Sequence, residues 1–127
     1  NREARLTISS YRDLLIWKAA MDLATDCYRA TGDFPKTEIY GLTSQIRRAA
    51  GSVPANIAEG HGRELTGAFI QFLRVAQGSL KELETHLMLA SRLNLLEEGR
   101  LQELLQAAEE IGKMIRSMIR RLQEKSA

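Results

Sequence analysis

The chain of 127 residues has little of several residue types that define whole classes of protein. Its single cysteine, Cys27, excludes an intrachain disulfide framework and every site built on a Cys-x-x-Cys pair. Cys27 lies in a helical apolar pattern, which predicts a buried and inert thiol. No run of about 18 apolar residues occurs, so we expect no membrane span. The length suits one domain, and the sequence therefore predicts a single cytoplasmic domain.

Motifs for catalysis and metal binding are also missing. The two histidines are His61 and His86, and neither has a glutamate three residues before it, so the Glu-x-x-His pairs of bundle metal sites do not occur. A metal held by His61 with Glu64 is a weaker alternative. No glycine-rich phosphate loop follows a strand, and no serine has a histidine and a carboxylate at a recognisable spacing. We therefore expect no enzymatic activity, no metal and no cofactor.

The chain has only two prolines, and no segment alternates apolar and polar residues for long enough to form a strand. Apolar residues instead recur at steps of three and four, which indicates amphipathic helices. Short loops place successive helices antiparallel, so the sequence predicts an all-α, up-down-up-down four-helix bundle. We expect a disordered or extended leader over 1–10 and one domain over 11–127, with helices at about 11–31, 36–62, 66–93 and 97–123.

The apolar seams of these helices can be assigned by residue. The second helix keeps its apolar stripe in phase across Pro54, which predicts one kinked helix rather than two short ones. Leu15, Ile16 and Leu105 are candidates for exposed apolar positions that dock a partner. The expected seams are Leu14, Trp17, Met21, Ala24 and Tyr28 in the first helix; Ile46, Ala50, Val53 and Ile57 in the second; Phe69, Leu73, Ala76, Leu80, Leu83, Leu87 and Ala90 in the third; and Leu101, Leu104, Ala108, Ile111, Ile115, Met118 and Leu122 in the fourth, where Leu105 and Ile119 widen the stripe.

The second helix carries a polar stripe opposite its apolar face: Arg48, Ser52, Asn56, Glu59 and Arg63. One interpretation is a structural hydrogen-bond network, and another is contact with the phosphates of a nucleic acid. A third is an ordinary solvated face. The network would contain Arg48, Ser52, Asn56, Glu59, Ser79 and Glu82. The phosphate contacts would be Arg47, Arg48, His61, Arg63, Arg74, Lys113, Arg116, Arg120 and Arg121.

Charge is distributed unevenly, although the formal net charge is only +2. Bases from Lys113 to Lys125 follow a segment rich in glutamate, which either complements the helix macrodipole or forms a patch for phosphate backbones. Aromatic side chains suited to base stacking are scarce, with three Phe, three Tyr and one Trp. The sequence thus favours contact with the backbone over readout of single-stranded bases.

Two segments resemble a known family. The run Tyr40-Gly41-Leu42 followed by Gln45-Ile46-Arg47-Arg48-Ala49, and then Asn56-Ile57-Ala58-Glu59-Gly60, is similar to the core of the 23S rRNA intervening-sequence proteins, which are small bacterial four-helix bundles. The resemblance implies assembly into a ring-shaped homopentamer. It also implies a distant similarity to the accessory variability determinant proteins of retroelements, which are thought to bind nucleic acid. Gly51 departs from the family pattern, where a slightly larger small residue is expected.

These observations predict a non-enzymatic oligomeric bundle that associates with structured RNA or DNA through backbone charge. The alternative is an assembly adaptor that docks another protein on an oligomeric ring, with the polar stripe serving structure alone.

Overall fold

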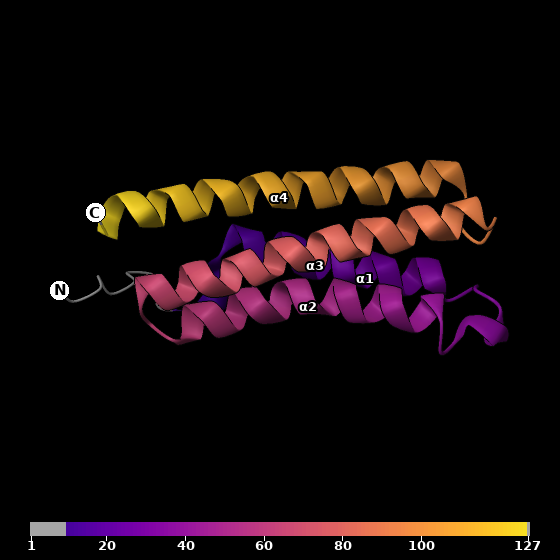
Figure 1. Cartoon of the computed structure of the whole chain (residues 1–127), viewed down its shortest axis with the longest axis horizontal. Helices are drawn as coiled ribbons and strands as arrows, with labels where there is room; N and C mark the ends of the chain where they lie inside the picture. Colours follow the sequence, from indigo (N-terminus) through magenta and orange to yellow (C-terminus); the bar gives the residue numbers. More distant parts are fainter. Residues whose placement is uncertain (1–9, 127) are drawn as a thin grey trace.

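The computed structural model describes residues 10–126, which form four long α-helices with no strand among them (Figure 1). This confirms the predicted all-α four-helix bundle. A short 3-10 helix precedes α1 and another precedes α2. The elements in chain order are η1 (Tyr11–Asp13), α1 (Leu15–Thr31), η2 (Lys36–Glu38), α2 (Leu42–Gly62), α3 (Thr66–Arg92) and α4 (Glu98–Ser126).

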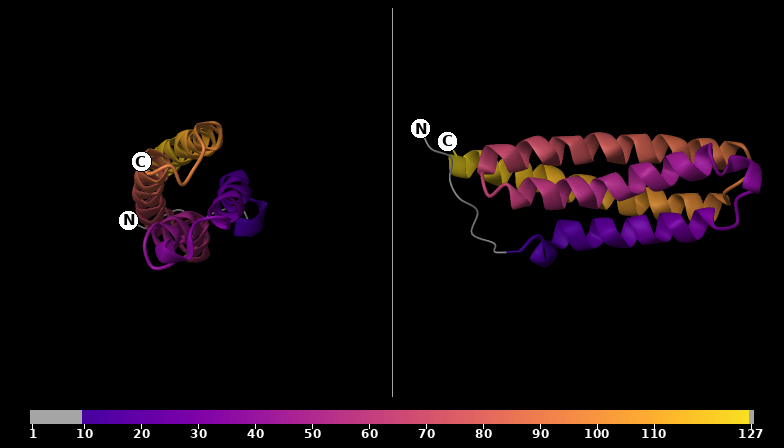
Figure 2. Two further views of the ribbon diagram at one scale, coloured as in Figure 1. Left: turned by 90° about the vertical axis from the view of Figure 1, so that its right-hand side faces the viewer. Right: turned by 90° about the horizontal axis from the view of Figure 1, so that it is seen from below.

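The four helices surround one apolar core in the order of the chain, as the view along the bundle shows (Figure 2). Each helix packs against its neighbours in sequence, and α1 also packs against α4 to close the bundle. The contact between α2 and α3 is the most extensive of the four, and that between α1 and α4 is the least. The side of the bundle formed by α1 and α4 is therefore the most open.

The seams predicted for α3 and α4 line the core. Every predicted α3 position is buried, and in α4 only Met118 is half-buried while Ile119 joins the buried set. These helices have a strict seven-residue period and one apolar stripe, so periodicity alone identifies the buried face. Asn94 follows α3 with a φ of 61°, a conformation that asparagine tolerates at the end of a helix.

The seam predicted for α1 is wrong in part. Met21 and Tyr28 are exposed, whereas Ile16, Ala20, Leu23 and Cys27 are buried with Ala24. The two sets are offset by one residue at the same helical spacing, and the structure turns the set that contains Ala20 and Cys27 toward the core. Leu15 is 72% exposed as expected, but Ile16 is only 3% exposed and Leu105 is half-buried against the core.

The second helix begins later than predicted, at Leu42 rather than near residue 36. The Glu38 carboxylate accepts a hydrogen bond from the Leu42 backbone N–H at 3.1 Å and so satisfies a free donor of the first turn. A Cβ at Gly41 would lie 2.9 Å from that carboxylate oxygen, so glycine leaves room for the cap. As predicted, α2 continues through Pro54 as one helix.

Candidate nucleic-acid interface

The inner part of the polar stripe on α2 forms a compact cluster with α3. The Ser52 and Ser79 hydroxyl oxygens lie 2.7 Å apart. The Asn56 side-chain amide donates to the Ser52 hydroxyl at 2.9 Å and to the Ser52 carbonyl at 2.8 Å. Ser79 is buried, so its hydroxyl group depends on this contact for a partner. The cluster joins α2 to α3, so these hydrogen bonds serve the packing of the two helices.

The outer members of the predicted network bond elsewhere. Glu59 forms an exposed ion pair with Arg63 at 3.1 Å, one turn along α2. Glu82 lies 3.8 Å from His86 on α3. Arg48 is exposed, and no described residue forms a hydrogen bond or an ion pair with it. The structure therefore holds three separate groups of polar contacts instead of one network.

Arg47 takes a role that the sequence did not indicate. Its guanidinium group donates to the Thr31 hydroxyl at 2.8 Å and to the Tyr28 carbonyl at 3.2 Å. It also lies over the Tyr28 ring, 4.7 Å from the centroid. These contacts place a cation at the C-terminal end of α1, where carbonyl groups lack helical partners and the macrodipole is negative. Arg47 thus ties α2 to α1.

Two further residues predicted to contact phosphate occupy unfavourable positions. His61 is only 6% exposed, and its ring stands edge-on to Phe69 with centroids 5.6 Å apart. Its Nε2 atom is buried without a hydrogen-bond partner. A phosphate on the surface does not reach this ring, so the prediction for His61 does not fit the structure. Arg63 is exposed, but its charge is already paired with Glu59 and it lies over Phe72.

The basic residues of α4 are exposed and divide between its two flanks. Arg116 lines a groove between α3 and α4, whereas Lys113 and Arg121 line a groove between α1 and α4. Arg120 lies one turn beyond Arg116, on the same side as the α3–α4 groove. The cluster that the sequence suggests is therefore two sets of cations with different surroundings.

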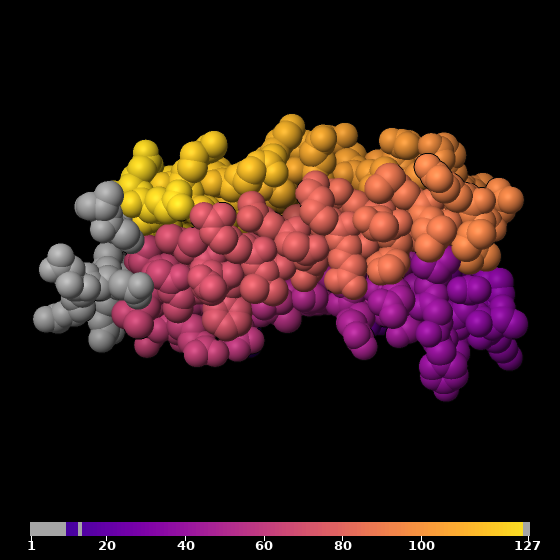
Figure 3. All heavy atoms as spheres, viewed as in Figure 1, coloured from indigo at the N-terminus to yellow at the C-terminus, as the bar shows by residue number. Residues whose placement is uncertain are grey.

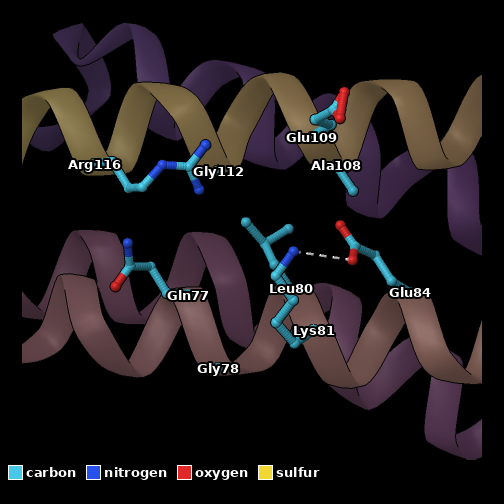
Figure 4. A pocket seen from close by; sticks show the side chains of 9 residues that line it. All are labelled: Gln77, Gly78, Leu80, Lys81, Glu84, Ala108, Glu109, Gly112 and Arg116. Carbon is cyan, nitrogen blue, oxygen red and sulfur yellow. Dashed lines mark hydrogen bonds and ion pairs between the residues drawn. The ribbon is translucent and has the colours of Figure 1, made fainter.

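The groove between α3 and α4 has a volume of ≈ 420 Å³ (Figure 4). The side chains of Arg116 and Gln77 face each other at one end. At the other end Lys81 pairs with Glu84 at 3.2 Å. Leu80 forms part of the apolar floor. The groove lies on the face where α3 and α4 run side by side (Figure 3), and its positive end is the one that contains Arg116.

Arg74 extends this positive end. It lies about one turn before Gln77 on α3, and because α3 and α4 are antiparallel it lies at the same end of the bundle as Arg120. We define the basic flank as Arg74, Arg116 and Arg120. All three side chains are exposed, and none forms an ion pair with a residue that the structure describes. Gln77 and Lys81 border this flank and were not predicted, although their spacing from Arg74 is helical.

The described part of the chain shows neither a metal-binding cluster nor a reactive thiol. Within residues 10–126, no three histidine, cysteine or acidic side chains gather where they could hold a metal ion. No helix in that range is both long and apolar enough to cross a membrane. Burial and the neighbouring Asp26 raise the pKa of the Cys27 thiol from 9.0 to about 12, against a smaller opposite effect of Arg100. As predicted, the thiol is buried, and this pKa makes it unreactive at neutral pH.

Comparison with known protein families assigns this chain to one of them. The model of the 23S rRNA-intervening sequence protein family matches residues 12–117, which is most of the chain and includes all of α1, α2 and α3. The chain belongs to this family. The match includes Arg74 and Arg116 of the basic flank but ends before Arg120.

A solved structure shares this four-helix architecture. One similar structure is the crystal structure, at 1.70 Å resolution, of a protein with unknown function from the S23 ribosomal protein family of Bacteroides thetaiotaomicron VPI-5482. It superposes with a TM-score of 0.74 at 22% sequence identity, covering 83% of this chain and 98% of that chain. At this identity the similarity supports the fold alone. A comparison with curated proteins finds no match.

Proposed function

We propose that this protein is a non-catalytic nucleic-acid-associated protein of the cytoplasm that binds the phosphate backbone of structured RNA or DNA through the basic flank. The observation that carries the proposal is the state of Arg74, Arg116 and Arg120, which are exposed and lack an acidic partner among the described residues. An arginine that already pairs with an acid must lose that ion pair to bind a phosphate. Arg74, Arg116 and Arg120 have no such ion pair to lose among the described residues.

The arrangement favours the backbone over the bases. Three cations along two antiparallel helices present a ridge of charge, and no exposed aromatic side chain lies among them on which a base could stack. Binding of this kind is independent of sequence and falls steeply with salt. We further propose that the protein assembles into a homopentamer, in which five copies of the flank would produce a strongly positive surface from protomers of small net charge.

The test combines light-scattering mass with fluorescence-anisotropy titration of a hairpin RNA and a DNA duplex at about 50 and 200 mM salt. We expect binding to both, with a loss of one to several orders of magnitude between the two salt concentrations. The variant R74A/R116A/R120A should bind more weakly and reduce the salt slope on the DNA duplex by about 0.9 for each phosphate contact removed. A matched control, K18A/K36A/R92A, removes three exposed cations elsewhere and should bind like the parent.

Equal binding by the flank variant and the parent would refute the proposed surface. Failure of the parent to bind either nucleic acid at micromolar concentration would refute the function itself. The mass measurement tests the pentamer separately, because loss of the flank should leave it unchanged.

A further inference from the structure

The groove between α1 and α4 differs in chemistry from the basic flank. Its volume is ≈ 450 Å³, and it lies where α1 begins beside the second half of α4. Leu15, Met114 and Met118 contribute apolar surface to it. Lys113, Ser117 and Arg121 also line it, and among the residues whose side chains the structure describes no acid does.

The exposed leucine in this groove follows from the local sequence. Leu14 is the N-cap residue of α1 and has an extended backbone, whereas Leu15 and Ile16 are the first two residues of the helix and are about 100° apart around its axis. Leu15 and Ile16 therefore cannot both face the core. Leu14 and Ile16 turn inward, and Leu15 is left 72% exposed. This is a large apolar side chain placed beside two half-buried methionines, which adapt readily to a partner.

We propose that this groove binds an acidic amphipathic helix of another protein. Apolar surface between two cations, with no acid among the described lining side chains, complements a segment whose own apolar side chains are flanked by carboxylates. Lys113 and Arg121 are eight residues apart on α4, which is about 12 Å along a helix axis. Two carboxylates seven or eight residues apart on the partner helix match that separation, with apolar residues three or four positions after the first.

A helical partner fits better than an extended one. The described chain has no strand, so an incoming β-strand would find no sheet edge with which to pair. A third helix can lie along the groove between two antiparallel helices and pack its side chains between theirs. The proposal is independent of nucleic-acid binding, because it uses the opposite flank of α4.

The probe is a phage-displayed library of helical peptides of about 16 residues, selected on the wild-type protein and counter-selected on the L15E variant. We expect enriched peptides to carry two carboxylates about two turns apart around leucine, methionine or phenylalanine. One such peptide, labelled with fluorescein, should lose about tenfold or more in affinity for L15E and for R121E. L15S serves as a second, milder variant if L15E melts below the parent.

Matched controls lie at the other end of the bundle. R92E reverses an exposed charge and L93E replaces an exposed leucine, and both should bind the peptide within about twofold of the parent. The proposal is overturned if no peptide is enriched, if enriched peptides lack acids, or if L15E and R121E bind them like the parent. It is also overturned if L15E lowers the light-scattering mass without affecting the peptide, since the groove is then an interface between copies. A loss of RNA binding in R121E as large as in R74A/R116A/R120A would assign the cation to the nucleic-acid surface instead.

Discussion

The Ser52 hydroxyl on α2 and the Ser79 hydroxyl on α3 lie 2.7 Å apart, at the contact between the two most extensively packed helices. Ser79 is 8% exposed and sits directly before Leu80 of the core seam. A buried hydroxyl group without a partner is costly, so this pair favours one alignment of α2 against α3 over its neighbours. Asn56 strengthens the arrangement because it bonds to Ser52 from the next turn.

Replacement of either serine should therefore destabilise the protein. In S52A the Ser79 hydroxyl and the Asn56 amide both lose a partner, and we expect a loss of about 1–3 kcal/mol in the free energy of unfolding. The double variant S52A/S79A should cost less than the sum of the single changes, because no hydroxyl is then left unpaired at the contact. Urea denaturation of the four proteins measures this coupling. T85A, which removes an exposed hydroxyl bonded within α3, is the control, and strictly additive losses would contradict the role of the pair.

Two glycines of α2 should respond in opposite ways to the same change. A Cβ at Gly60 would lie 2.5 Å from the Phe72 Cβ and 3.2 Å from a Phe69 ring carbon, whereas a Cβ at Gly51 would meet nothing within 4 Å. We expect G60A to destabilise by about 1–3 kcal/mol through overpacking. G51A should stabilise by about 0.5–1 kcal/mol, because alanine favours the helix. Thermal unfolding of both variants distinguishes them, and a destabilised G51A would show that the space beside α2 is needed.

Much of the fold follows from the sequence, and the exceptions have physical causes. In α3 and α4 one apolar stripe recurs every seven residues, so Leu83 or Ile115 can be placed in the core without a structure. In α1 two stripes compete, and only packing against the other helices selects Cys27 over Tyr28. The start of α2 depends on a side-chain cap from Glu38, which the helical pattern of the following residues does not reveal.

The candidate site was less predictable. Arg47 and Arg48 are adjacent and chemically identical, and the sequence assigned Arg47 to phosphate contact and Arg48 to either role. The structure gives Arg47 three contacts with α1 and leaves Arg48 exposed. The residues that a helix presents to its neighbour depend on its rotation about its own axis. Adjacent residues such as Arg47 and Arg48 point about 100° apart around that axis, so only one of them faces α1. For the same reason, Arg116 and Arg121 on α4 line different grooves, one beside α3 and the other beside α1.

The difference between these arginines gives a direct test. R47A removes two hydrogen bonds from a charged donor and a cation–π contact, so we expect a loss of about 1–3 kcal/mol in the free energy of unfolding. R47K should recover only part of the lost stability, because the ammonium group of lysine cannot reproduce the planar set of N–H donors of the arginine guanidinium group. R48A should change stability by no more than about 0.5 kcal/mol. Chemical denaturation measures all three, and an equal loss in R47A and R48A would contradict the assigned contacts.

Cys27 should make stability fall at alkaline pH. Burial and Asp26 raise the pKa of its thiol in the folded protein to about 12, against an ordinary value of 9.0. Well below pH 9.0 the thiol is protonated in both states and adds no pH dependence. Above it the unfolded chain loses the proton while the folded protein retains it, so the free energy of unfolding decreases until about pH 12. Lysines and tyrosines titrate in the same range, and C27A is therefore the necessary comparison.

The stability advantage of the parent over C27A should shrink steadily as the pH is raised from about 8 to 11, because only the parent carries the thiol. Urea denaturation of both proteins at each pH gives this difference directly. Alkylation with iodoacetamide supplies an independent measurement, since the reactive species is the thiolate and Cys27 is 0% exposed. The native protein should react orders of magnitude more slowly than the protein in urea. A rapid native reaction, or a constant difference between parent and C27A, would show that water reaches the thiol and that α1 opens readily from the bundle.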